Sequence, residues 1–286
     1  MCSFQDALFP VNVHHKKTLV KINAIIDFIR NQKTVTIRQL FYHLVVKGLV
    51  ENKLSAYGSL CKLVTNLRYN CEIPFNSIAD STSLYGTCQY ESLDELLNKI
   101  KSTYRSNWNI EFSPYMEVWL EKEALTNIVQ PITNSFGVYL SVSSGRTKIS
   151  QVHSFINRAN KYDDKSALIL YLGDFDPTGL NIDENLNEQF NKQSQYIEFP
   201  DITVKRIAIT EQQLCNLPRS YQTAKPTDPN YEVFTQKYGF QVWELDAFTP
   251  SELKDIVLRE IEKYRTADKI EALEERDREE IENIWR

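Results

Sequence analysis

Apolar residues along this 286-residue chain follow two different spacings. In the first part they recur every three to four positions, which is the period of a helix that buries one face. Three such stretches are predicted as helices, at 17–30, 37–46 and 55–68. In the second part, short apolar runs alternate with helical stretches. This order predicts an α/β fold with a parallel sheet and helices on both faces.

Four apolar runs in the second part are predicted as strands. The most apolar is 167–172, A-L-I-L-Y-L, which is typical of a strand buried on both faces of a parallel sheet. The others are 115–120, 138–142 and 204–209. The helix that follows 115–120 is expected to stop before Pro131.

Acidic residues stand at the carboxyl ends of two of these strands, where ligands of open α/β sheets bind. Glu121 follows 115–120, and Asp174 and Asp176 follow 167–172. Carboxylates placed this closely repel each other, and water, a basic side chain or a divalent cation relieves that repulsion. Three oxygen ligands without His or Cys nearby suit Mg²⁺ or Mn²⁺ rather than zinc. The three residues are predicted metal ligands, with a solvated turn as the alternative for the two aspartates.

The charge distribution indicates that the first part meets a polyanion. The chain has a net charge of -5, but residues 1–70 contain ten Lys or Arg against three Asp or Glu, a balance of +7 that leaves -12 for the remainder. Three helices followed by a short strand or wing at 72–75 form the pattern of a winged-helix module, a type of helix-turn-helix domain whose third helix usually enters a DNA groove. The alternative is a helical domain with a solvated basic face.

Three basic residues are expected to contact DNA. Lys62 and Arg68 face outward on the predicted third helix, and Arg146 lies in a loop of small residues at 143–147. Dinucleotide-binding and phosphate-loop folds are excluded because neither of their glycine motifs occurs.

Tyr42 lies away from the centre of the apolar stripe of the second helix, which falls between Leu40 and Phe41. Its hydroxyl is therefore expected to be reachable by solvent or a ligand. Arg38 lies one turn earlier on the same side, where its guanidinium can hold a phosphate and favour the phenolate. The pair is a candidate nucleophile site, although an exposed tyrosine on a helix is usually an ordinary surface residue.

A polar stretch at 80–114 separates the two parts, and the domain boundary is placed near residue 105. The resulting domains are 1–105, the winged-helix DNA-binding domain, and 106–286, the parallel-sheet domain with a C-terminal helical extension. That extension, 251–286, is amphipathic and is expected to pack on the sheet or on a second subunit.

The acidic residues Glu244 and Asp246 precede the extension. They are expected to form a solvated turn, with membership of the metal shell as the alternative.

No apolar run approaches the ~20 residues that cross a bilayer, and the N-terminus lacks the layout of a signal peptide. Five cysteines without a Cys-x-x-Cys pair suit a reducing compartment. The protein is therefore expected to be cytoplasmic, without a membrane partner.

Glu121-Lys122-Glu123-Ala124, the loop around Gly145, and the stretch from Gly173 to Leu180 resemble the TOPRIM domain of the topoisomerase VI A subunit and of the related meiotic double-strand-break transesterase. Upstream, Arg38-Gln39-Leu40-Phe41-Tyr42 is similar to the Arg-x-x-Phe/Tyr-Tyr motif of that family's winged-helix domain, whose last tyrosine attacks DNA. The resemblance covers roughly residues 35–215.

This resemblance implies Mg²⁺, or Mn²⁺, at Glu121, Asp174 and Asp176, and cleavage of double-stranded DNA by attack of Tyr42 while Arg38 stabilises the phosphate charge. It also implies a nucleoid-associated homodimer, in which the tyrosine of one subunit meets the metal site of the other, and a separate ATPase subunit as a further partner. The alternatives are a hydrolytic nuclease that uses metal-activated water, in phage or plasmid defence, and a non-catalytic DNA-binding module. The tail of the chain looks more like stand-alone bacterial and phage TOPRIM proteins.

Overall fold

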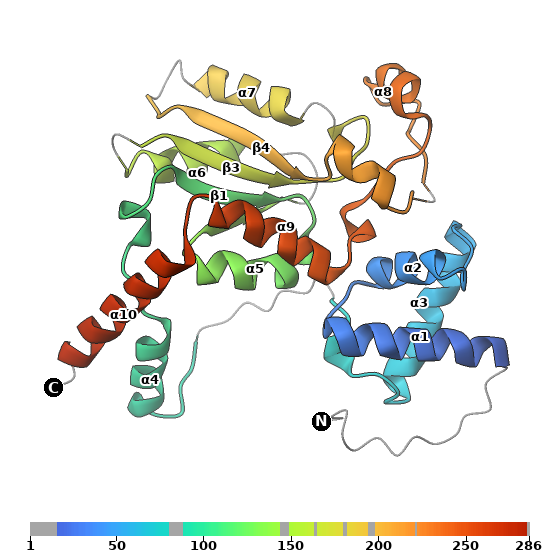
Figure 1. Cartoon of the computed structure of the whole chain (residues 1–286), viewed down its shortest axis with the longest axis horizontal. Coiled ribbons are helices and arrows are strands. Elements are labelled where there is room, and N and C mark those ends of the chain that lie inside the picture. The colour runs from blue at the N-terminus through green and yellow to red at the C-terminus, as the bar shows by residue number, and fades with distance from the viewer. Residues whose placement is uncertain are drawn as a thin grey trace.

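A computed structural model describes residues 16–79, 88–143, 149–162, 165–179, 182–193, 198–220 and 222–284. These parts form a mixed α/β structure with a four-stranded parallel sheet (Figure 1). Residues 16–79, here called the head, form three helices at one side of the sheet part (Figure 1). The α/β class predicted from the apolar spacing is confirmed. Within the described residues, no helix is long and apolar enough to cross a membrane.

The sheet has the strand order β2-β1-β3-β4. Its two central strands, β1 (Tyr115–Leu120) and β3 (Ala167–Leu172), are buried throughout and have the predicted bounds. The outer strands differ slightly from the prediction and are β2 (Tyr139–Val142) and β4 (Ile202–Ala208). β1 and β3 pair in register up to their last residues, Leu120 and Leu172. The chain segments that follow them therefore leave the sheet next to each other.

Helices cover both faces of the sheet. On one face lie α5 (Thr126–Ser135) and α9 (Pro250–Glu262), and on the other lie α6 (Ile149–Ala159) and α7 (Ile182–Gln193), as Figure 1 shows. Leu253, Val257 and Ile261 of α9 join the hydrophobic core of the first face. The C-terminal extension therefore packs on the sheet of its own chain. The remaining helices of this part are α4 (Leu93–Thr103), α8 (Tyr231–Tyr238) and α10 (Ala267–Ile284).

The prediction that the helix after β1 stops before Pro131 is wrong, because α5 continues through this proline to Ser135. Proline in a helix interior removes one backbone hydrogen bond and costs about 3 kcal/mol. The buried face of α5, with Ile128, Val129 and Thr133, offsets that cost. Packing against the sheet thus outweighs the local preference of the sequence.

The head consists of α1 (Lys16–Gln32), α2 (Ile37–Val46) and α3 (Leu54–Tyr69), around its own hydrophobic core. The prediction of a strand at 72–75 is wrong. A short 3-10 turn, Phe75–Ser77, follows instead, with the Ser77 amide donating to the Pro74 carbonyl at 3.1 Å. The extended pairing observed in the head is a single bridge between Val35 and Ile78.

Gly48 ends α2 in a left-handed conformation, with a φ of 67°. Its amide donates to the Val45 carbonyl, and the Leu49 amide donates to the Leu44 carbonyl, both at 2.9 Å. This pair of hydrogen bonds satisfies the last carbonyls of the helix and requires a positive φ at Gly48. Gly58, inside α3, has helical backbone, and a side-chain carbon added there would meet nothing within 4 Å.

These two glycines make a matched pair. Gly48→Ala is expected to lower the free energy of unfolding by about 1 kcal/mol, because alanine is strained at positive φ. Gly58→Ala is expected to raise it by about 0.5 to 1 kcal/mol, because alanine loses less conformational entropy in a helix. Urea unfolding of both variants measures the difference. Equal stability of the two would contradict the assigned end of α2.

Candidate functional site

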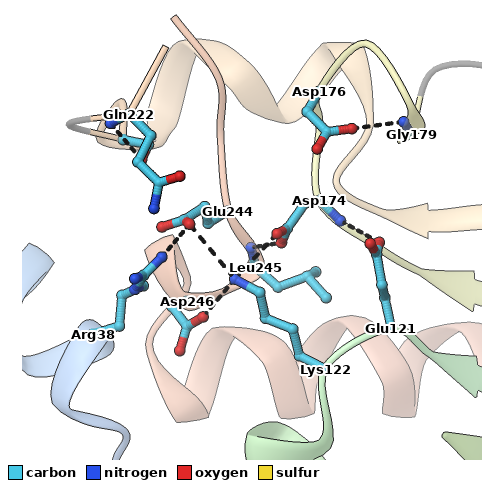
Figure 2. A network of polar contacts seen from close by, with 12 residues as sticks. Arg38, Glu121, Lys122, Asp174, Asp176, Gly179, Gln222, Glu244, Leu245 and Asp246 are labelled. Atoms are coloured by element: carbon cyan, nitrogen blue, oxygen red, sulfur yellow. Dashed lines mark hydrogen bonds and ion pairs between the residues drawn. The ribbon is translucent and has the colours of Figure 1, made fainter. Parts of the chain in front are cut away.

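The predicted acidic residues of the sheet do lie at one edge, at the carboxyl ends of β1 and β3 (Figure 2). The Oε2 atom of Glu121 accepts hydrogen bonds from the Asp174 amide at 3.0 Å and from the Tyr171 hydroxyl at 3.1 Å. A side-chain carbon on Gly173 would lie 2.5 Å from that oxygen. Gly173 therefore allows the Glu121 carboxylate to lie against the start of the next loop.

The loop 173–179 holds Asp176 through backbone contacts. Asp176 Oδ1 accepts from the Gly179 amide at 2.6 Å, which closes a tight turn. On β4, Arg206 donates to the carbonyls of Gly173 at 3.1 Å and Gly179 at 2.6 Å. One guanidinium thus ties both ends of the loop together, which fixes the carboxylates in place.

A second segment bonds to the loop from outside. Thr178 donates a hydrogen bond to Asp228, and Asn230 Nδ2 donates to the Pro177 carbonyl at 3.1 Å. The signal for this contact in the sequence is weak, because Asp228 lies about 50 residues after the loop.

The carboxylates at the edge are incompletely neutralised. Burial, and then the charge of Asp174, raise the pKa of Glu121 to about 7. Burial also raises the pKa of Asp176. Within the described residues, Glu121 Oε1 and Asp176 Oδ2 take part in no hydrogen bond or ion pair. A cation between such groups would lower the cost of their ionised forms.

Lys122 supplies a positive charge next to this edge. Its ammonium lies 3.1 Å from Asp174 Oδ2, 2.8 Å from Asp246 Oδ2 and 4.0 Å from Glu244 Oε1 (Figure 2). Burial alone would lower the pKa of Lys122, but the three carboxylates raise it above its ordinary value. Asp174 Oδ1 accepts in addition from the Leu245 amide at 2.8 Å. Asp174 is therefore engaged on both oxygens.

The expectation that Glu244 and Asp246 form a solvated turn is wrong. They are 7% and 4% exposed. The segment 243–248 lies against the acidic loop because Phe175 and Trp243 exchange backbone hydrogen bonds at 2.8 and 3.0 Å. The sequence offered little sign of this, since acidic side chains are seldom buried unless they are paired, and their partners are distant in the chain.

Tyr42 is also buried, at 1% exposure, so the expectation of a reachable hydroxyl is wrong. Its hydroxyl donates to Glu244 Oε2 at 2.9 Å, and Arg38 forms an ion pair with Glu244 Oε1. Burial and the charge of Glu244 raise the pKa of Tyr42, and the opposing effect of Arg38 is smaller. The phenol therefore stays protonated in this arrangement, and the expected stabilisation of a phenolate is not found.

The 244–248 segment covers the side of α2 that was expected to be open. Thr36 Oγ1 donates to Asp246 Oδ1 at 2.6 Å, and Gln39 Nε2 donates to the Phe248 carbonyl at 3.1 Å. Thr36 and Gln39 also form the capping box of α2. The start of α2 thus contacts the same acidic residues that Lys122 contacts.

Oxygen donors without sulfur or nitrogen suit Mg²⁺ or Mn²⁺, so Glu121, Asp174 and Asp176 fit such an ion in chemistry. In the described parts of the chain, however, no three acidic, histidine or cysteine side chains are gathered into a ready metal site. Asp174 is engaged instead by Lys122 and the Leu245 amide. Among the described residues, Glu121 and Asp176 each offer one oxygen that has no partner.

Two of the predicted DNA contacts, Lys62 and Arg68, lie outside this network. Lys62 is exposed on α3. Arg68, near the end of α3, donates to the Phe75 carbonyl at 3.0 Å. Arg146 lies outside the described residues.

Comparison of the chain with protein-family models, with curated proteins and with solved structures gave no match. The assignment of a function therefore depends on the side chains at the sheet edge and on the head.

Lys122→Met is expected to lower the free energy of unfolding by about 3 kcal/mol at neutral pH, because it leaves the half-buried Asp174 and the buried Asp246 without their cation. Urea unfolding measures this loss. Lys192→Met is the control, since its ion pair with Glu188 is exposed and its removal should leave stability unchanged.

The effect of Lys122→Met should depend on pH in a defined direction. Burial opposes ionisation of Asp246, but Lys122 and Thr36 outweigh it and hold the pKa of Asp246 below its ordinary value. The stabilisation is therefore present at neutral pH and is lost as the pH falls through that lowered pKa. The difference in free energy of unfolding between the wild type and Lys122→Met should become smaller in acid. A difference that grows in acid would contradict the role of the ion pair.

Proposed function

We propose that the protein is a metal-dependent nuclease of TOPRIM type, which hydrolyses DNA phosphodiester bonds at the sheet edge formed by Glu121, Asp174 and Asp176. The observation that carries this proposal is the placement of three acidic residues at the carboxyl ends of β1 and β3. Burial raises the pKa of all three, and within the described residues Glu121 and Asp176 each have one oxygen without a partner. The resemblance of the surrounding motifs to TOPRIM domains supports it. The head, with its three helices, is the proposed DNA-binding part.

Glu121, Asp174 and Asp176 would hold Mg²⁺ or Mn²⁺. Such an ion neutralises phosphate charge and lowers the pKa of a water, which provides a nucleophile at neutral pH. In the hydrolysis, the water gives one proton to the solvent as its oxygen bonds to phosphorus, the bond from phosphorus to the leaving sugar oxygen breaks, and that oxygen takes up one proton from the solvent.

The chain's own residues orient this chemistry. Gly173 lets Glu121 approach the loop, and Arg206 holds the loop ends. The ammonium of Lys122, 3.1 Å from Asp174, holds that carboxylate at the same edge.

Water is the proposed nucleophile because Tyr42 is buried and its hydroxyl donates a hydrogen bond to Glu244. The second candidate is transesterification by Tyr42, with Arg38 beside it. One observation favours it: Glu244 accepts from Tyr42 and lies 4.0 Å from Lys122, which in turn pairs with Asp174. For this route the Tyr42 hydroxyl has to leave Glu244 and lose its proton. The homodimer and the ATPase subunit belong to this second candidate.

A cleavage assay tests the choice. The protein is incubated with end-labelled duplex DNA and Mg²⁺ or Mn²⁺, then denatured and separated on a gel. We expect free cleavage products that persist in Tyr42→Phe and vanish in Asp174→Asn, in Asp176→Asn and in the presence of EDTA. Glu188→Gln, an exposed acid on α7, is the control that should cleave normally.

Other outcomes select the alternatives. DNA that stays covalently attached to the protein, and whose attachment is lost in Tyr42→Phe, would establish transesterification. Intact DNA binding without cleavage under any condition would leave a non-catalytic DNA-binding module.

Metal binding can be tested without catalysis. Titration of Mn²⁺ followed by electron paramagnetic resonance should show that Asp176→Asn binds Mn²⁺ at least about tenfold more weakly than the wild type, because a charged ligand oxygen is lost. Gly173→Ala should have a similar effect, because its new side-chain carbon would lie 2.5 Å from Glu121 Oε2. Gly58→Ala is the matched control, with open space around the added methyl group. Unchanged affinity in both site variants would place the metal elsewhere.

A further inference from the structure

Two large aromatic side chains are exposed next to each other where α3 ends. Tyr69 is 74% exposed and Phe75 is 53% exposed. Their ring centroids lie 6.0 Å apart at an interplanar angle of 78°, an edge-to-face arrangement. The guanidinium of Arg68 lies 5.2 Å from the Phe75 ring centroid and donates to the Phe75 carbonyl at 3.0 Å. Arg68, Tyr69 and Phe75 are here called the aromatic patch.

A basic hollow of about 480 Å³ adjoins the patch. Its lining residues are Ile29, Arg30, Lys33, Pro74, Asn76 and Ser77. Phe75 lies between two of these residues in the chain and so connects the hollow with the patch. The lining contains two cations and an amide but no acidic side chain, which suits a phosphate group.

The surroundings carry the same sign of charge. Residues 16–79 contain ten Lys or Arg and three Asp or Glu, and α3 has no acidic residue. Among the described residues, Lys33 and Cys71 are the non-glycine residues with positive φ, at 67° and 57°. Lys33 follows α1 and lines the hollow, and Cys71 follows α3 and directs the chain toward Phe75. Unusual backbone geometry is thus concentrated in the two turns that build this surface.

We infer that the aromatic patch and the hollow bind single-stranded DNA, with an unpaired base on Tyr69 and Phe75 and the adjoining phosphate at Arg30 and Lys33. Exposed aromatic rings and cations side by side are the features that single-strand binders use, because each base stacks through its face while the backbone meets positive charge. In a duplex the base faces are already covered by their neighbours. The inference rests on the proposed function and adds to it a site on the head for an unpaired stretch next to the duplex that the sheet edge cleaves.

Binding of fluorescein-labelled oligo(dT) to the full-length protein tests this, by fluorescence anisotropy in EDTA. Tyr69→Ala should weaken binding about fivefold or more, as expected from loss of one base stack, while Tyr69→Phe should bind like the wild type. Phe75→Ala should weaken binding similarly. Phe240→Ala, an aromatic residue of 61% exposure outside the head, is the control.

Salt dependence tests the phosphate contact. Lys33→Gln should reduce the slope of log affinity against log salt by about 0.7, the value for one phosphate contact on a single strand. A 20-base-pair duplex should lose no more than about twofold affinity in Tyr69→Ala, because stacking on a ring requires an unpaired base.

Four results would overturn the inference. They are unchanged oligo(dT) binding in Tyr69→Ala, an equal loss for duplex and single strand, tighter binding of oligo(U) than of oligo(dT), and self-association in sedimentation that Tyr69→Ala abolishes. Because binding is measured in EDTA, and can be repeated in Asp174→Asn, its outcome is independent of whether the sheet edge cleaves DNA.

Discussion

One half-buried ammonium group joins the sheet, the loop after β3 and the segment before α9. Lys122 directly follows Glu121 at the end of β1, and its charge is shared by Asp174 on the loop after β3 and by Asp246 on the segment before α9. Asp246 in turn accepts from Thr36 at the start of α2. Without a cation at this point, several carboxylates would face one another in a poorly solvated space, which is strongly unfavourable.

The same ion pairs decide what the acidic edge can do. Asp174 has Lys122 and the Leu245 amide as partners, whereas Glu121 and Asp176 each retain one oxygen without a partner among the described residues. The edge is therefore asymmetric: Asp174 is partly compensated on the side toward the head, although burial still raises its pKa, and Glu121 and Asp176 are less compensated. A positively charged group, either a metal ion or part of a ligand, is favoured on the second side.

Hydrogen bonds and ion pairs also hold the head against the segment that precedes α9. Arg38 and Tyr42 both bond to Glu244, and Gln39 bonds to the Phe248 carbonyl. Interfaces built from hydrogen bonds and ion pairs are characteristic of parts that can move relative to each other. The contact between the head and the segment 244–248 thus keeps Tyr42 covered and protonated. Any reaction in which the tyrosine acts as the nucleophile depends on the same contact. The aromatic patch at the carboxyl end of α3 uses none of these residues.

The sequence by itself determined the main helices and strands and the position of the acidic residues at one edge of the sheet. Periodicity predicted the three head helices and the bounds of β1 and β3, and the parallel order of the strands then brought Glu121, Asp174 and Asp176 to one edge, because carboxyl ends of parallel strands lie together. Local signals were sufficient since each of these features depends on neighbours in the chain.

Only the tertiary structure decided which face of α2 is covered, and by what. Helical periodicity placed Tyr42 outside the apolar stripe, but it could not reveal that Glu244, about 200 residues later, would pair with it. The burial of Glu244 and Asp246 and the passage of α5 through Pro131 have the same cause. Their free energy comes from partners distant in sequence, and such contacts leave no periodic pattern in the residues that make them.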